Sequence, residues 1–180
     1  MPKRFSIAFP LLILLGIQPS LADVSGSWDV SYQPKPKISV TAFGQPIDNL
    51  KLPPMPAVDR ITFTPDAGFP HTGSLDSTLF SGEWKQSKSN IKGTASQTMI
   101  EKLMNGYLEQ GSLYGFSFTG GQLLKAKNRM AAKESKNGTL QGSFVHVSTW
   151  RIHLTQPKKM TVPIQVKLLA NFKGTRSAAE

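Results

Sequence analysis

The sequence predicts a mainly β protein: a single antiparallel β-barrel, or a barrel-like sandwich, of about eight to ten strands with one short helix. Three observations support this prediction. Apolar and polar residues alternate along most of the chain, an Asn-Gly pair is placed to close a hairpin, and one segment keeps helical spacing with capping residues. The chain has no cysteine, so disulfides and cysteine-ligated metals are excluded and the fold must depend on its apolar core.

The first 22 residues are typical of a cleavable export signal. A basic start is followed by a mostly apolar run at residues 5–17, and Ser20-Leu21-Ala22 places small residues where a signal peptidase cuts. The alternative, a membrane anchor, needs about 20 apolar residues, and Pro19 ends this run sooner. We expect residues 1–22 to be removed and residues 23–180 to form one soluble domain in the periplasm or outside the cell.

The strand pattern is clearest near the two ends of the mature chain. Val24 to Tyr32 and Met160 to Phe172 both place an apolar residue or glycine at every second position, which is typical of a half-buried strand. Pro163 cannot donate to a strand ladder, so the second strand is expected to lie at an edge or to begin near that residue. Shorter strands are predicted at residues 61–63 and 114–118.

A hairpin is predicted at Asn137-Gly138, because Asn-Gly is the strongest two-residue turn signal when both positions take positive φ. The segment before it, residues 122–135, is ambiguous. Its Ala, Lys and Met residues favour a helix, yet its basic and apolar residues also alternate. The hairpin directly after it favours a strand, with Leu124, Ala126 and Met130 facing inward.

Two regions interrupt the strand pattern. Residues 34–56 contain six prolines and are predicted to be a surface loop with at most a short strand at 38–43. Residues 98–110 are predicted to form the helix, since their apolar residues recur at helical spacing. Thr98 and Glu101 have capping-box spacing, and Gly111 is placed to end the helix.

Gly-x-aromatic recurs as Gly26-Ser27-Trp28, Gly82-Glu83-Trp84 and Gly142-Ser143-Phe144, so that each glycine shares a strand face with the aromatic residue. The first copy, at the start of an exported and mostly β chain, resembles the first motif of lipocalins and the wider calycin group. The resemblance implies that Trp28 lies in the first strand and closes one end of an antiparallel barrel. It also implies an arginine from the last strands over that ring, for which Arg151 is the candidate.

Seven residues with inward parity are the candidate ligand-binding set, and they would either line the barrel or fill it. They are Trp28, Trp84, Tyr114, Phe116, Phe144, His146 and Trp150. Within this set two alternatives stay open for His146: a hydrogen-bonded core residue, or a polar contact for a ligand in an apolar cavity. Trp28 is likewise a core residue or a ligand contact.

The chain has 21 basic and 11 acidic residues, a formal charge of +10 that falls to +8 without Lys3 and Arg4. Such a balance attracts anionic surfaces, although a solvated basic surface is the simpler interpretation. The densest basic set is the candidate anion-binding surface, an outward stripe if the segment is a strand: Lys125, Lys127, Arg129, Lys133 and Lys136. No aromatic residue interleaves it, which argues against nucleic acid as a partner.

Catalytic and metal-binding patterns are absent from the sequence. It contains no nucleophile elbow, phosphate loop, zinc-protease motif or dinucleotide fingerprint, and its histidines lack metal-ligand spacing on one face. We therefore expect no enzyme, no metal and no cofactor.

Two functions remain as hypotheses. The first is an exported, non-catalytic, lipocalin-like binding or accessory protein of the cell envelope that holds a small apolar or amphipathic ligand in its barrel. The alternative is an interaction protein whose barrel is filled and whose basic surface docks on an anionic envelope component or a partner protein.

Overall fold

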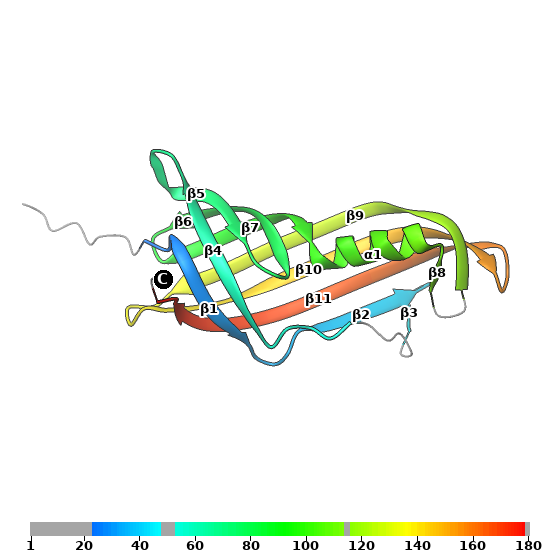
Figure 1. The fold of residues 1–180 in the computed structure, drawn as a ribbon, viewed down its shortest axis with the longest axis horizontal. Helices are drawn as coiled ribbons and strands as arrows, with labels where there is room; N and C mark the ends of the chain where they lie inside the picture. Colours follow the sequence, from blue (N-terminus) through cyan, green and yellow to red (C-terminus); the bar gives the residue numbers. More distant parts are fainter. Residues whose placement is uncertain (1–22, 48–52, 114–115, 179–180) are drawn as a thin grey trace, which may run out of the picture.

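The computed structural model describes residues 23–47, 53–113 and 116–178. This part of the chain is mainly β, with one antiparallel sheet that closes into a ring and one helix, which confirms the predicted fold class (Figure 1). The predicted signal segment, residues 1–22, lies outside the described residues. The elements are β1 (Gly26–Tyr32), β2 (Lys37–Ala42), β3 (Gln45–Pro46), β4 (Val58–Asp66), β5 (Phe69–Asp76), β6 (Phe80–Ser87), β7 (Asn90–Thr98), α1 (Met99–Gln110), β8 (Ser112–Leu113), β9 (Phe116–Glu134), β10 (Thr139–Gln156) and β11 (Met160–Arg176).

The ring runs through β1, β4, β5, β6, β7, β9, β10 and β11 and then returns to β1. Trp28 of β1 lies opposite Ile61 of β4 on one side and opposite Arg176 of β11 on the other. Closing the ring pairs the edges of the sheet, which would otherwise expose unsatisfied backbone groups. The short strands β2, β3 and β8 lie outside this ring.

Three strands are much longer than the others and run beyond the ring. β9, β10 and β11 have 19, 18 and 17 residues, whereas β1 has seven. Residues 172–176 of β11 pair with β1, while residues 164–169 pair with β2. One strand therefore closes the barrel with its second half and continues into a second structure with its first half. We call the closed ring the barrel half. We call the parts of β9, β10 and β11 that run beyond the ring, together with β2, β3 and α1, the extension (Figure 1).

The barrel half is filled by large side chains. Phe80 and Phe144 stack with ring centroids 4.1 Å apart, and Phe63 meets Trp84 edge-on at 5.6 Å. These four side chains and Trp28 have at most 2% of their surface exposed. Aromatic residues bury more area than any other type, so a few of them occupy the interior of a small barrel.

Local signals in the sequence account for the elements they predicted. The inward parity of β1 and of β11 is confirmed, and Pro163 lies three residues after the start of β11, just before its pairing with β2 begins. The hairpin between β9 and β10 is confirmed, but its predicted turn type is wrong. Gly138 has a φ of 71°, while Asn137 is not among the residues with positive φ, so the connection is the longer turn 135–138.

The helix is confirmed with both of its predicted ends. The Glu101 N–H donates to Thr98 Oγ1 at 3.2 Å, and the Thr98 N–H donates to Glu101 Oε2 at 3.1 Å, which completes the capping box. At the other end Gly111 takes a left-handed φ of 67°, and its N–H donates to the Leu108 carbonyl at 3.3 Å. In the Pro-rich segment 34–56, β2 forms where the short strand was predicted; residues 48–52 lie outside the described residues.

Candidate functional site

An apolar cavity of about 360 Å³ lies within the extension, between α1 and the sheet. The helix supplies Met104, Tyr107 and Leu108, and the facing strands include Ile152 of β10 and Val162 of β11. Side chains from β2 and β9 complete the wall, which exposes no polar atom to the cavity. Its volume lies toward the lower end of the roughly 300 to 1,000 Å³ found for small-molecule sites.

The periodicities of the helix and the strands place these side chains. Met104 and Leu108 are four residues apart and so lie on one face of α1. Ile152 of β10 and Val162 of β11 are directly paired and point to the same side of the sheet. Gly121 of β9 lets the helix come close, because a Cβ at that position would lie 2.7 Å from Leu108 and 2.6 Å from Ile152.

The cavity runs from a buried floor to an exposed rim. Ile152 and Val162 have 2% and 6% of their surface exposed. Phe43, Phe116 and Met160, which also line the cavity, have 58%, 45% and 39% exposed, and they lie at element ends far from the ring. Large apolar side chains gathered at one exposed place are typical of a binding site, since they cost free energy when left in water.

A belt of buried and partly buried polar groups lies on the inner face of the sheet, between the filled barrel and the cavity. The Trp150 Nε1–H donates to Ser148 Oγ at 2.9 Å, and Ser148 Oγ lies 2.8 Å from His146 Nε2. His146 Nδ1 lies 2.7 Å from Asn128 Oδ1, and the Asn128 amide donates to Glu101 Oε1 at 3.1 Å. Because Glu101 belongs to the capping box, the belt connects the sheet to the first turn of α1.

The belt fits a neutral His146. Since the Trp150 N–H occupies one lone pair of Ser148, the Ser148 hydroxyl is free to donate to His146 Nε2, and Nδ1–H then donates to Asn128. Burial lowers the pKa of His146, and Glu101 only partly offsets this effect. The first turn of the helix is therefore joined to the sheet by a hydrogen-bonded chain in which His146 is neutral.

The candidate residues from the sequence are divided between the two halves. Trp28, Trp84, Phe144, His146 and Trp150 are buried in the core or the belt and do not line the cavity. Phe116 does line it, and Tyr114 lies outside the described residues. Prediction from the sequence missed Met104, Leu108, Ile152 and Val162, although the helical spacing and the alternation were both visible there.

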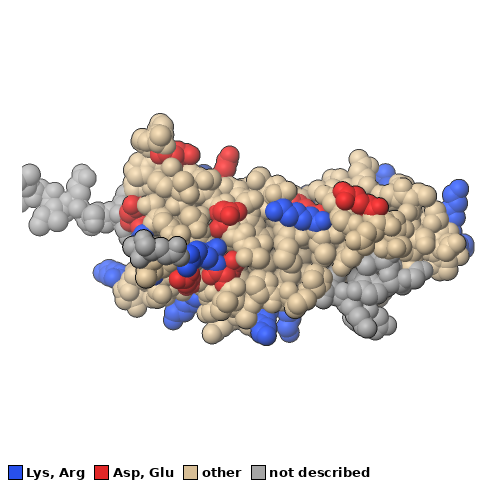
Figure 2. Space-filling view, viewed as in Figure 1, with Lys and Arg blue, Asp and Glu red and all other residues tan. Residues whose placement is uncertain are grey.

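The basic candidates lie on the other side of the same sheet. Lys125, Lys127, Arg129 and Lys133 are exposed on β9, and Lys136 is exposed in the following turn. Arg129 lies opposite Val145 of β10. Figure 2 looks onto the side that carries α1 and shows most of its visible Asp and Glu side chains over the barrel half. The charges of the two signs are therefore unevenly distributed.

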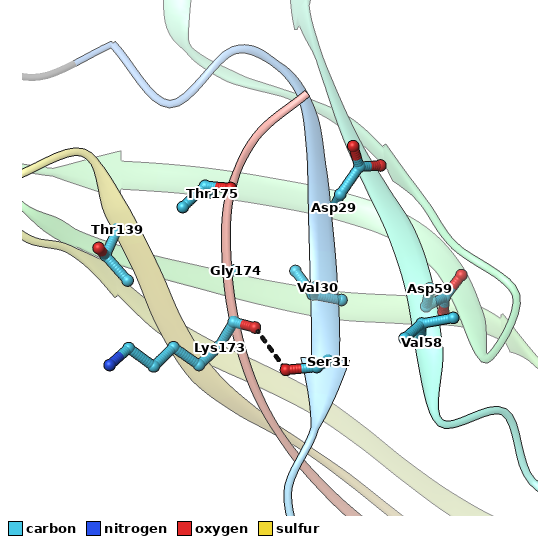
Figure 3. A pocket seen from close by; sticks show the side chains of 9 residues that line it. All are labelled: Asp29, Val30, Ser31, Val58, Asp59, Thr139, Lys173, Gly174 and Thr175. Atoms are coloured by element: carbon cyan, nitrogen blue, oxygen red, sulfur yellow. Dashed lines mark hydrogen bonds between the residues drawn. The ribbon is translucent and has the colours of Figure 1, made fainter. Parts of the chain in front are cut away.

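A second hollow, of about 600 Å³, lies on the outside of the barrel half between β1, β4 and β11. Its two carboxylates already have partners: Asp29 pairs with Arg60 at 2.9 Å, and Asp59 accepts hydrogen bonds from Tyr32 at 2.8 Å and from Thr78 at 2.7 Å. In Figure 3 the Lys173 side chain points away from both carboxylates. This hollow is larger than the cavity, but its two carboxylates are already used in contacts within the protein.

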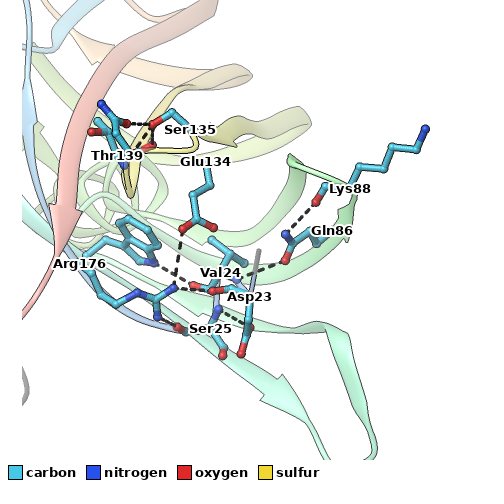
Figure 4. Close-up of polar contacts among 11 residues, drawn as sticks. Asp23, Val24, Ser25, Gln86, Lys88, Glu134, Ser135, Thr139 and Arg176 are labelled. Atoms are coloured by element: carbon cyan, nitrogen blue, oxygen red, sulfur yellow. Dashed lines mark hydrogen bonds and ion pairs between the residues drawn. The ribbon is translucent and has the colours of Figure 1, made fainter. Parts of the chain in front are cut away.

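The end of the barrel half is closed by Arg176. Its guanidinium lies 4.7 Å from the Trp28 ring centroid, donates to the carbonyls of Asp23 and Ser25, and lies 4.0 Å from the Glu134 carboxylate (Figure 4). Arg151, the candidate for this position, is instead exposed on β10. That assignment is wrong because residue 151 has the outward parity of its strand, whereas Arg176 lies directly opposite Trp28.

Among the described residues, no group of three His, Cys, Asp or Glu side chains could hold a metal ion. In the same part of the chain, no helix has the length and apolar character needed to cross a membrane. Comparison of the chain with protein-family models, with curated proteins and with solved structures finds no match in any of the three.

Proposed function

We propose that this chain is an exported, non-catalytic binding protein whose extension holds one long apolar chain, such as the acyl tail of an amphiphile. One observation carries the proposal: the cavity beneath α1 is walled by apolar groups alone and ends at an exposed apolar rim. We place the ligand there rather than inside the ring, because aromatic side chains fill the ring.

The wall defines the part of the ligand that enters. Burying a polar group without a hydrogen-bond partner costs several kcal/mol, and burying an unpaired charge costs more. A ligand segment in this cavity must therefore be hydrocarbon, while a polar head stays at the rim near Phe43, Phe116 and Met160. An amphiphile with a single tail meets both conditions.

Two features of the chain support the wider proposal. Export is supported by the signal-like residues 1–22, which suit a protein that handles apolar molecules outside the cytoplasm. The resemblance to lipocalins is supported by the contact of Arg176 with Trp28, since that group places an arginine from the last strands over the tryptophan of the first.

The test is displacement of a fluorescent fatty acid from the protein without residues 1–22. Ala42 lines the cavity, so Ala42→Trp should fill part of it and weaken binding by about tenfold or more. Ala57→Trp is the matched control, because Ala57 is exposed and does not line the cavity. Equal affinity for the two variants, or no binding by the unmodified protein, would refute the proposal.

A series of saturated fatty acids measures the depth of the site. Each methylene group that becomes buried contributes about 0.8 kcal/mol, so affinity should rise about fourfold per carbon. The rise in affinity should stop once the tail fills the cavity, because further carbons then stay at the exposed rim. A flat series from the shortest acid onward would mean that the tail does not enter the cavity.

A further inference from the structure

The outer face of β2, β9, β10 and β11 carries cations and no exposed carboxylate. These four strands contain one acidic residue, Glu134, and its side chain is only 9% exposed beside Arg176. The exposed basic residues on the outer face, which we call the basic face, are Lys37, Lys125, Lys127, Arg129, Lys133, Arg151, Lys167 and Lys173. The sequence showed only the β9 part of this set, since strand pairing supplies the remainder.

Strand register places these cations in rows across the sheet. Lys127 lies opposite Val147, which lies opposite Lys167. Lys133, Gln141 and Lys173 form a parallel row. Neighbouring strands are about 4.8 Å apart, so cations on alternate strands are about 10 Å apart, close to the screening length in about 0.1 M salt. Their fields therefore add over the whole face.

We propose that the basic face docks on a bilayer that contains anionic lipids. Two exposed apolar side chains, Val145 at 38% and Leu169 at 52%, lie opposite each other in the middle of the face, in the row that joins Arg129 to Lys37. Cations around an apolar centre match the boundary between lipid head groups and acyl chains. An acidic polysaccharide would offer nothing to Val145 and Leu169, and single-stranded nucleic acid would need aromatic residues for stacking.

The docked orientation follows from the sheet. The long strands run along the long axis of the molecule, so a protein docked by this face lies flat on the bilayer (Figure 1). The cavity lies on the opposite side of the same sheet, under α1. Docking therefore uses none of the residues that line the cavity and does not depend on the proposed ligand.

The test compares two triple variants with equal loss of charge. Lys127→Gln, Arg129→Gln and Lys167→Gln remove the centre of the basic face. Lys85→Gln, Lys88→Gln and Lys102→Gln remove three cations from β6, the turn after it and α1, where Lys85 shares a hollow with Asp66 and Glu83. Binding is measured by co-sedimentation with vesicles of phosphatidylcholine and phosphatidylglycerol, with circular dichroism to confirm that each variant folds.

We expect the first variant to bind roughly 100-fold more weakly, about fivefold for each cation, and the control to lose less than about fivefold. Binding by the unmodified protein should disappear in about 1 M salt, where the screening length falls to about 3 Å. Equal losses in the two variants would overturn the proposal, because only net charge would then matter. Retention on heparin without vesicle binding would also overturn it, in favour of a polysaccharide.

A label at the centre of the face tests the orientation directly. The chain has no cysteine, so Val145→Cys and Ser74→Cys each accept a single fluorophore, and Ser74 lies on β5 at the barrel half. Vesicles should protect the label at residue 145 from an aqueous quencher and leave the label at residue 74 accessible. Protection at residue 74 alone would overturn the proposal, and the fatty-acid assay on the same proteins reports separately on the cavity.

Discussion

The barrel half and the extension share three long strands, yet one half is filled and the other is hollow. In the barrel half the inward residues include Trp28, Phe80 and Phe144, and strands surround them on all sides. In the extension β10 and β11 place aliphatic residues inward, such as Ile152 and Val162, and a single helix covers them. The difference shows that side-chain size along a continuous strand can set where a core ends and where a cavity begins.

The largest expected effect comes from truncation in the filled half. Phe144→Ala should destabilise the protein by about 3 to 5 kcal/mol, because it removes a fully buried ring and leaves a void. Met104→Ala in the cavity wall should cost less than about 2 kcal/mol, since that side chain is only partly buried and already borders empty space. Chemical denaturation of both variants measures the difference, and equal costs would contradict the contrast between the halves.

Overfilling the extension should have the next largest effect. In Gly121→Ala the new methyl group would lie 2.7 Å from Leu108 Cδ2 and 2.6 Å from Ile152 Cδ1, so the ends of these two side chains must shift, at a cost of about 1 to 2 kcal/mol. Fatty-acid affinity should change as well, because Leu108 lines the cavity. Unchanged stability together with unchanged affinity would mean that the helix does not lie as close to β9 as the structure has it.

The polar belt between the halves should make stability depend on pH. Burial lowers the pKa of His146 in the folded protein, so the unfolded chain takes up a proton first as the pH falls. The free energy of unfolding should therefore decrease below pH of about 6.5, by at most about 1.4 kcal/mol per pH unit, until the folded-state pKa is reached. Denaturation of the unmodified protein and of His146→Gln across this range isolates the effect, which the variant should lack.

The smallest expected effect concerns the helix alone. Gly106 lies inside α1, and no atom lies within 4 Å of the Cβ that an alanine would add. Gly106→Ala should stabilise the protein by about 0.5 to 1 kcal/mol, because it lowers the entropy lost when the helix forms. A thermal melt measures the gain. A loss of stability would show that α1 needs flexibility at this residue.

The sequence predicted those elements whose signals are local. The capping residues Thr98 and Glu101 and the alternation in β11 each lie within a few positions of the structure they specify. The cavity could not be predicted in this way. It arises because β11 exchanges β1 for β2 as its partner between residues 169 and 172, and no short pattern records which distant strand pairs where.

A bulge is a second reason why prediction failed in the extension. Lys125 lies opposite Thr149, but Leu123 lies opposite Trp150, so Leu124 is an extra residue. The inward parity of β9 is therefore reversed at residues 121–123, until a second shift between Gly120 and Phe118 restores it, and Leu124, predicted to face inward, is 46% exposed. Alternation in a single strand does not show such a shift, because a bulge is defined only against its partner.

The pairing of β1 with β11 has a consequence for the order in which the chain folds. Ser31 donates to the Lys173 carbonyl across 142 positions of sequence, and Arg176 meets Ser25 across 151. Contacts of such separation form late, because the entropy of closing the intervening loop must be met before they stabilise anything. When the chain is synthesised from its amino end, β1 and β4 form before β11 has been made. The ring cannot close until residues 172–176 are available to pair with β1. During that interval β1 offers an open edge to any extended partner, including another copy of the chain.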